Sequence, residues 1–492
     1  MNETLFSFNI FNRETERMNK IIELNAKEAM TNKRFLEREI NKWKTSTKRK
    51  LMLTGEDYYQ NKHDILKRKR TVIGEGGELQ EVTNLPNNKI IDNQYAKMVD
   101  QKVNYLLGQP LTFDTENKTY SEILQKTFNK RFQRTFKNLG EDCLNHGIAW
   151  LHPYYNDQGE LNFKRFEGYE IIPFWKDAEH TILEFAIRIY EVQAYDGERE
   201  TTIEKVEVFT PTGIDRYILS KGSLIKDIEN PSSSYILVEE KGYNWEKIPL
   251  IAFKYNNKEI PLIKKVKTLQ DGINTILSDF QNNMQEDARN TILVLVNYDG
   301  TNLGEFRHNL AQYGAVKVTS VDGLAGDLKT LQIEVNPENY KTILQIFKKA
   351  MVENAMGYDA KDDRIIGGTP NQMNIQSMYS DIDLDANGME TEFQAAFEEL
   401  LWFVNVHLAN TGKGNFTDEL VTVIFNRDMM MNETEIVDNC QKSMGILSHE
   451  SIVGQHPWVS DLEQELARIK DEREEEMKDM YGEAFGDDGD EE

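Results

Sequence analysis

Two long stretches of this sequence have the apolar spacing of a helix that carries a single hydrophobic stripe. Residues 259–288 and 337–356 both show it, and Pro337 is favourable in a first helical turn. The apolar positions of the first stretch are Leu262, Val266, Leu269, Ile273, Ile276, Phe280 and Met284. Those of the second are Tyr340, Ile343, Leu344, Phe347 and Met351. A helix with one stripe cannot bury itself, so we expect both to pack against a neighbour, within the chain or in another subunit.

The rest of the chain alternates between helical and strand-like patterns in long blocks. Residues 92–107 and about 120–146 have helical spacing, and Gly108 and Pro110 end the first of these helices. From about 148 to 253, aromatic and β-branched residues alternate with turn residues, which predicts antiparallel strands. Further predicted elements are strands at 291–298, 313–320 and 419–425 and a helix at 373–410. This order of helices, strands and helices is typical of an α+β fold.

The charge is strongly negative and unevenly distributed. The formal net charge is -25, and residues 461–492 hold fifteen acidic against four basic residues. Tight DNA binding is not expected, because neutralising phosphates requires Lys and Arg. Residues 1–70 are basic by contrast, with clusters at 48–50 and 67–70 that face DNA, an acidic neighbour or solvent. We expect no membrane span, no secretory signal and, with only Cys143 and Cys440, no disulfide framework.

Motifs that carry catalytic or metal chemistry are missing from the sequence. Asp381, Asp383, Asp385 and Glu392 match positions 1, 3, 5 and 12 of a calcium loop, but Ala386 stands where the sharp turn needs glycine. We therefore expect a helix with an acidic face there. No phosphate-binding loop, zinc-type His/Cys pair or serine-hydrolase elbow is present. We expect no cofactor, no metal and no enzyme activity, but missing motifs do not exclude an active site assembled from distant residues.

Four segments have amino-acid sequences similar to those of one known family. They are residues 87–113 (NNKIIDNQYAKMVDQKVNYLLGQPLTF), 292–306 (ILVLVNYDGTNLGEF), 370–393 (PNQMNIQSMYSDIDLDANGMETEF) and 445–469 (GILSHESIVGQHPWVSDLEQELARI). In these segments the chain resembles the portal proteins of tailed bacteriophages, in the branch with long non-contractile tails. The resemblance extends over about residues 50–480.

The resemblance implies a portal-like fold with a helical stem, a small mixed α/β clip, an α/β wing with antiparallel strands and a helical crown. Its implied boundaries follow the predicted elements: wing 1–258, stem helix 1 259–288, clip 289–336, stem helix 2 337–356, tunnel loop 357–372, long wing helix 373–410, crown 411–481 and acidic disordered tail 482–492.

The resemblance also implies a function, partners and sites. Portal proteins form a ring, usually a homododecamer, at one capsid vertex of the virion. Double-stranded DNA is packaged and ejected through this head–tail connector without being tightly bound. The implied partners are other copies of the chain, the terminase large subunit, a head-completion adaptor, and scaffold and major capsid proteins, with assembly in the host cytoplasm. The implied DNA-facing loop residues are Lys361, Arg364, Ile365, Gly367, Gly368 and Asn371. The implied stem seam between subunits is Val266, Leu269, Ile273, Phe280, Tyr340 and Phe347.

Other classes of protein stay open on the residues alone. One is another structural protein of a phage head, such as a minor capsid subunit. A second is a metal-dependent nuclease whose carboxylates come from distant positions. A third is a helical interaction scaffold.

Overall fold

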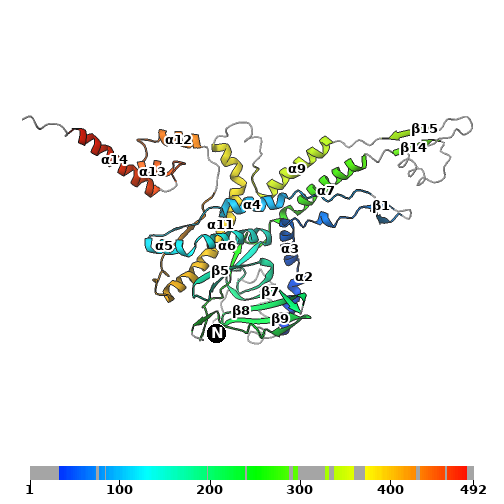
Figure 1. The fold of residues 1–492 in the computed structure, drawn as a ribbon, viewed down its shortest axis with the longest axis horizontal. Coiled ribbons are helices and arrows are strands. Elements are labelled where there is room, and N and C mark those ends of the chain that lie inside the picture. Colours follow the sequence, from blue (N-terminus) through cyan, green and yellow to red (C-terminus); the bar gives the residue numbers. More distant parts are fainter. Residues whose placement is uncertain are drawn as a thin grey trace, which may run out of the picture.

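A central body carries two helical extensions on opposite sides in the computed structural model of the chain (Figure 1). The structure describes residues 33–73, 77–83, 85–196, 198–238, 241–287, 292–296, 327–331, 337–359, 372–427, 433–459 and 462–484. Helices α7 (Ile263–Asp287) and α9 (Pro337–Ala355) project from one side as a pair, which we call the arm. Helices α12 (Glu433–Lys442), α13 (His449–Gly454) and α14 (Leu462–Ala484) lie on the other side. No described helix is long and apolar enough to span a membrane.

The lower part of the body is a five-stranded antiparallel sheet with strand order β10-β9-β8-β7-β6. Its strands are β6 (Ile171–Trp175), β7 (Leu183–Asp196), β8 (Arg199–Thr210), β9 (Gly213–Ser220) and β10 (Ser223–Lys226). Helix α2 (Lys33–Thr45) packs its apolar stripe, including Leu36 and Ile40, into the same core cluster as the sheet. A small hairpin, β11 (Ile236–Val238) with β12 (Lys241–Tyr243), follows.

The upper part of the body is built around helix α11 (Gln372–Asn410). It packs with α3 (Thr47–Tyr59), α4 (Gln94–Leu107), α5 (Lys118–Thr127) and α6 (Lys130–His146) and with a three-stranded sheet in one apolar core. The sheet has strand order β13-β4-β5, from Ile251–Lys254, Ile148–Tyr155 and Leu161–Phe166. Short elements connect these parts: η2 (Asp64–Lys67), β1 (Thr71–Ile73), β2 (Leu79–Glu81) and η3 (Gly168–Glu170).

The mixture of helices and antiparallel strands confirms the predicted α+β class. The predicted helix at 120–146 is instead two helices, because Asn129 begins a new one. Its Oδ1 atom accepts hydrogen bonds from the backbone N–H groups of Arg131 and Phe132, which is the geometry of an N-cap. The calcium-like segment lies inside α11, as the helical alternative predicted.

Three predictions, two of strands and one of where the crown begins, are compared here with the structure. Strand β14 (Ile292–Val296) forms where a strand was expected, and its partner is β15 (Asp327–Leu331). The other expected strand, 313–320, lies outside the described residues. Residues 411–427, predicted to begin the crown, belong to the body instead. Here β16 (Thr422–Ile424) pairs with β3 (Thr112–Asp114), and Phe416 and Phe425 join the main core.

One face of α7 is polar and yet fully buried. Its side chains recur every four residues: Gln270, Asn274, Ser278 and Asn282. An extended segment, residues 86–93, which we call the strap, lies along this face. Backbone N–H groups donate to the four side chains over 2.8 to 3.1 Å, in reverse chain order: Tyr95, Asp92, Ile90 and Asn88. Four helical residues rise about 6 Å and two extended residues about 6.6 Å, so the repeats match for the three donors in the strap. The fourth donor, Tyr95, lies three residues further along, in the first turn of α4.

Candidate functional site

The arm is the most distinctive feature of the molecule, and it contains the predicted stem seam. The rings of Phe280 on α7 and Tyr340 on α9 lie 5.0 Å apart, and Asn283 Nδ2 donates to Tyr340 Oη at 2.8 Å. Leu269 and Phe347 pack against the main core and keep part of their surface. The apolar stripes of the two helices therefore bury each other within one chain.

The prediction that Val266 and Ile273 lie in a seam between subunits is wrong. Both side chains are completely buried within a single chain, so they have no surface left to contact a second subunit. The physical reason is the connectivity of the chain. The apolar stripe of α7 needs a partner helix, and α9 of the same chain supplies it, because the two helices run side by side (Figure 1).

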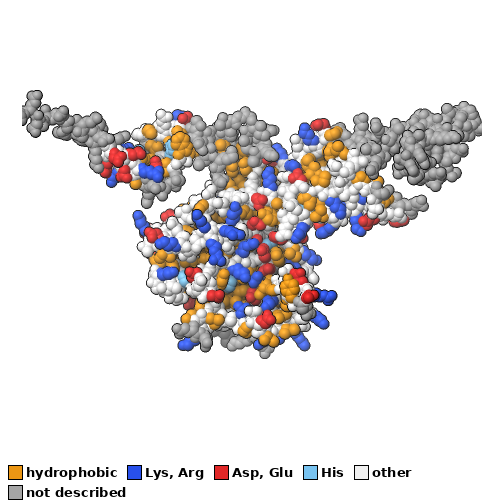
Figure 2. Space-filling model, viewed as in Figure 1, with side chains coloured by type: hydrophobic (Ala, Val, Ile, Leu, Met, Phe, Trp, Pro, Cys, Tyr) orange, Lys and Arg blue, Asp and Glu red, His pale blue; other side chains and the backbone are white. Residues whose placement is uncertain are grey.

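Other apolar residues of the arm remain exposed. Ile343 is 44% exposed and Ile346 is 58% exposed on α9, and Met284 is 54% exposed near the end of α7. Helical periodicity places Ile346 on the side of α9 away from the stripe that packs on α7. Figure 2 shows apolar side chains on the surface of the arm. The seam prediction did not include these residues: Ile346 lies on the outer side of the arm, and Ile343 and Met284 are exposed parts of the two stripes.

The predicted tunnel-loop residues Lys361, Arg364, Ile365, Gly367, Gly368 and Asn371 lie outside the described residues. The start of this loop is described and firmly held. The side chain of Gln101 on α4 both accepts from the Tyr358 backbone N–H and donates to its carbonyl, at 3.1 and 2.8 Å. Buried Lys102 donates to the carbonyl of Met356 at 3.0 Å and pairs with Asp385 on α11 at 2.7 Å. Helix α4 thus fixes the end of α9 to α11.

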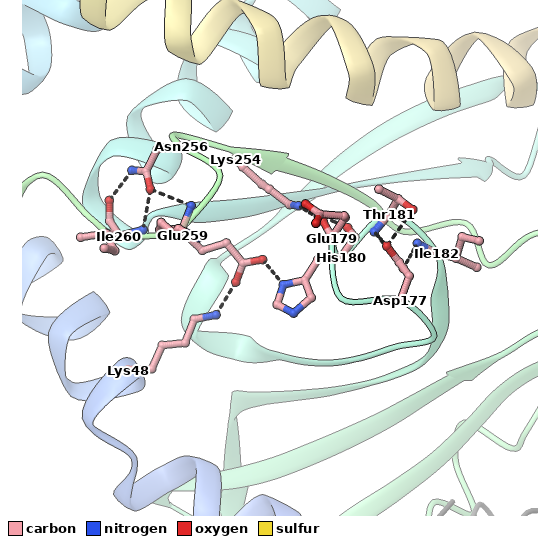
Figure 3. Close-up of polar contacts among 11 residues, drawn as sticks. Lys48, Asp177, Glu179, His180, Thr181, Ile182, Lys254, Asn256, Glu259 and Ile260 are labelled. Atoms are coloured by element: carbon pink, nitrogen blue, oxygen red, sulfur yellow. Dashed lines mark hydrogen bonds and ion pairs between the residues drawn. The ribbon is translucent and has the colours of Figure 1, made fainter. Parts of the chain in front are cut away.

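A cleft of about 760 Å³ opens beside α3, α11 and the loop that joins β6 to β7. Figure 3 shows its polar residues, with Glu259 at the centre. The Glu259 carboxylate accepts from His180 Nδ1 at 2.6 Å and from Lys48 Nζ. Both Glu259 (φ 53°) and His180 (φ 58°) have left-handed backbones, which non-glycine residues rarely adopt. The strain at two residues in contact marks the cleft as a constrained junction of three distant segments.

Comparison with known protein families shows which family the chain belongs to. A family described as "Phage portal protein, SPP1 Gp6-like" matches residues 38–479. The chain belongs to this portal protein family. A portal protein of Bacillus phage SPP1 is 30% identical over 482 residues, covering 96% of this chain and 93% of the relative. A portal protein of Clostridium phage phiCD119 is 29% identical over 435 residues, covering 85% and 92%.

Membership of the portal family confirms the family that the sequence resemblance predicted, and it agrees with a structural protein of the phage particle rather than an enzyme. Among solved structures, "Neck of native GTA particle computed with C12 symmetry" has a TM-score of 0.39 at 12% identity, covering 73% of this chain and 88% of that one. That overlap is too low to carry any argument about fold or assembly.

One cluster of possible metal ligands is present among the described residues of this portal family member. Glu56, His146 and Glu167 place one ligand atom each within 4.8 Å of one another. His146 is fully buried, with Nε2 3.3 Å from a Glu56 oxygen and Nδ1 3.4 Å from the backbone N–H of Gly168. The Gly168 N–H donates to Nδ1, so the neutral ring carries its proton on Nε2, on the side of Glu56. The cluster fits a histidine held by carboxylates better than a metal site.

The ion pair in the cleft gives a prediction for pH dependence. Burial opposes ionisation of Glu259, but the contacts from His180 and Lys48 outweigh it and lower its pKa to about 2, from 4.5 in an unfolded chain. A lowered pKa gives stability that is present above about pH 4.5 and is lost as the pH falls towards 2. From about pH 5 to pH 3, the unfolding free energy of the wild type should fall by about 2 kcal/mol more than that of Glu259→Gln. Denaturant titrations at each pH measure this, and parallel curves for the two proteins would contradict it.

Proposed function

We propose that copies of this chain form a closed ring, of twelve subunits in the capsid, at one vertex of a phage head. Double-stranded DNA passes through the ring during packaging and again during ejection. The observation that carries the proposal is the arm, a projecting helix pair with exposed apolar residues, in a chain of the portal family. Side-by-side contacts between unlike surfaces close into a ring when the rotation between neighbours is right.

Within this ring we assign the arm to the stem and residues 289–336 to the clip. Residues 1–258 and 373–427 form the wing, and residues 433–484 form the crown. The clip docks the terminase large subunit during packaging and a head-completion adaptor afterwards. Scaffold and major capsid proteins surround the wing during assembly in the host cytoplasm, and the finished ring is part of the virion.

The charge of the chain supports a conduit rather than a DNA clamp. A net charge of -25 disfavours strong contacts with phosphates, so DNA slides past the channel wall. We assign ATP hydrolysis to the terminase. The loop 360–371, whose two ends are held by α4 and by the start of α11, faces the DNA in the channel.

The test of this function removes the loop. A chain that lacks residues 360–369 should form rings of unchanged mass, because the arm and body are intact, yet package at least tenfold less nuclease-protected DNA per capsid. Mass photometry measures the ring, and quantitative PCR after nuclease treatment measures the DNA. The matched control is Tyr195→Ala, which alters an exposed side chain on β7. A chain that stays single at micromolar concentration, or normal packaging without the loop, would refute the proposal.

A further inference from the structure

Four cations of the two basic clusters that stand out in the sequence have carboxylate partners within the described chain. In the cluster 48–50, Lys48 pairs with Glu259. In the cluster 67–70, Arg68 lies 2.6 Å from Asp279 on the arm. Two neighbours in that cluster also have carboxylate partners: Lys67 with Asp64 and Lys69 with Glu81. Their charge is balanced by neighbouring carboxylates, so they are weaker candidates than unpaired cations for contact with an external polyanion.

A different group of cations, which we call the basic face, covers α5 and the first half of α6. Its members are Lys118, Lys126, Lys130, Arg131, Arg134 and Lys137. Lys137 is half-buried and the others are exposed. In the described part of the chain, Lys126 alone among them has a carboxylate partner, Glu122 at 4.0 Å. Figure 2 shows Lys and Arg side chains grouped over this part of the body. An unneutralised basic surface is unexpected on a chain with a net charge of -25.

The cations on α6 are arranged in a line. Lys130, Arg134 and Lys137 are separated by four and then three residues, so they follow one side of the helix at steps of about 6 and 4.5 Å. Phe132 and Phe136 hold the opposite side in the main core. The helix therefore cannot rotate, and Lys130 and Arg134 point to solvent, while the half-buried Lys137 donates from Nζ to Asn104 Oδ1 at 2.5 Å.

The local electrostatics of the two helices also favour an external anion. Neither α5 nor α6 has an acidic residue in its first turn, where acidic side chains would be stabilising. Lys130 and Arg131 occupy the first two positions of α6 instead, where the helix dipole repels positive charge. This arrangement weakens the isolated fold and becomes favourable once negative charge is bound.

We propose that the basic face binds the phosphate backbone of double-stranded DNA, without reading its sequence. The cations extend across two neighbouring helices, a surface broader than one acidic helix such as α14 covers, and arginine forks suit phosphate oxygens. The choice of DNA as the polyanion rests on the proposed function, while the charge arrangement does not. The basic face is therefore a second place, outside the channel loop, where the protein meets DNA.

The test measures binding of the full chain to a short fluorescent DNA duplex by anisotropy at increasing NaCl. Wild type should bind weakly, with log affinity falling linearly with log salt. Arg131→Glu with Arg134→Glu should lower the affinity at least about tenfold and reduce the salt slope by about two. The variant should be at least as stable as wild type, because glutamate near the start of α6 suits the helix dipole. Loss of binding therefore cannot be attributed to loss of folding.

A matched control reverses two exposed cations elsewhere, Lys226→Glu with Lys241→Glu, and should bind DNA like wild type. Equal loss in both double variants, or no binding by wild type at low salt, would overturn the proposal. So would carbodiimide cross-links from Lys126 or Lys130 to acidic residues of 461–492 without DNA binding, since these would assign the face to the acidic segment of the chain. Ring mass is measured in parallel: rings that do not bind DNA refute this inference alone, whereas DNA binding without rings refutes the proposed function alone.

Discussion

Replacing Phe397 by alanine is expected to lower the free energy of unfolding by about 3–5 kcal/mol. The Phe397 ring on α11 is fully buried and lies 5.2 to 6.4 Å from six other phenylalanine rings. These six come from β3, the α5–α6 junction, α6, β13 and the residue after β16: Phe113, Phe128, Phe132, Phe136, Phe253 and Phe425. The cavity would lie where strands β3 and β13, the segment after β16 and helices α6 and α11 meet.

Chemical denaturation followed by tryptophan fluorescence measures this loss. Trp458→Ala is the control, because Trp458 is 76% exposed and its truncation should change the unfolding free energy by less than about 0.5 kcal/mol. A loss of under about 1 kcal/mol for Phe397→Ala would mean that the aromatic cluster does not hold the upper body together.

Ring formation should be abolished by Ile346→Asp, while the single chain stays as stable as wild type. Ile346 is 58% exposed, so a charge there costs a lone chain little. In a ring whose neighbouring arms meet at this face, the same charge is buried without a partner. That costs about 3 kcal/mol or more at each interface, and closure repeats the cost once per subunit.

Mass photometry and thermal melting together separate the possible outcomes. The matched control is Ile273→Asp, which puts a charge into the chain's own core and should lower thermal stability sharply. Loss of rings in that variant therefore says nothing about a subunit interface. Normal rings from Ile346→Asp would exclude the outer face of α9 from the contact between subunits.

The parts of the fold with simple apolar periodicity could be predicted from the sequence. The arm helices were expected at 259–288 and 337–356 and lie at Ile263–Asp287 and Pro337–Ala355. The break at Asn129 was missed because apolar spacing continues across it, from Phe128 to Phe132. The signal that could have revealed it is the asparagine itself, a strong helix N-cap residue.

Contacts between distant segments could not be predicted from one sequence. The pairing of β3 with β16 joins strands roughly 300 residues apart, and nothing local in either strand identifies the other. The cleft likewise brings Lys48, His180 and Glu259 together from three segments. The assignment of Val266 and Ile273 to a subunit seam failed for a related reason. An apolar stripe shows that a helix needs a packing partner, but it does not show whether the same chain or another subunit supplies that partner.

The buried polar face of α7 misleads sequence reasoning in a different way. Gln270, Asn274, Ser278 and Asn282 have the spacing and polarity of a solvent-facing side. Their burial is tolerated because the strap and the first turn of α4 present a backbone N–H group to an oxygen of each side chain, and Asn282 Nδ2 is the one side-chain atom of the four residues that stays without a described hydrogen-bond partner. Only the structure shows that the two repeats lie against each other.

This matched repeat fixes the axial register of α7 relative to the strap, with about one hydrogen bond per helical turn. Sliding α7 along its own axis by less than one turn would break its hydrogen bonds to the strap, because each side-chain acceptor would leave its N–H donor. Helix α4 continues directly from the strap and holds the backbone of Tyr358, just after the end of α9, through Gln101. One continuous stretch of chain, residues 86–107, therefore fixes both the position of α7 along its axis and the position of the segment that follows α9.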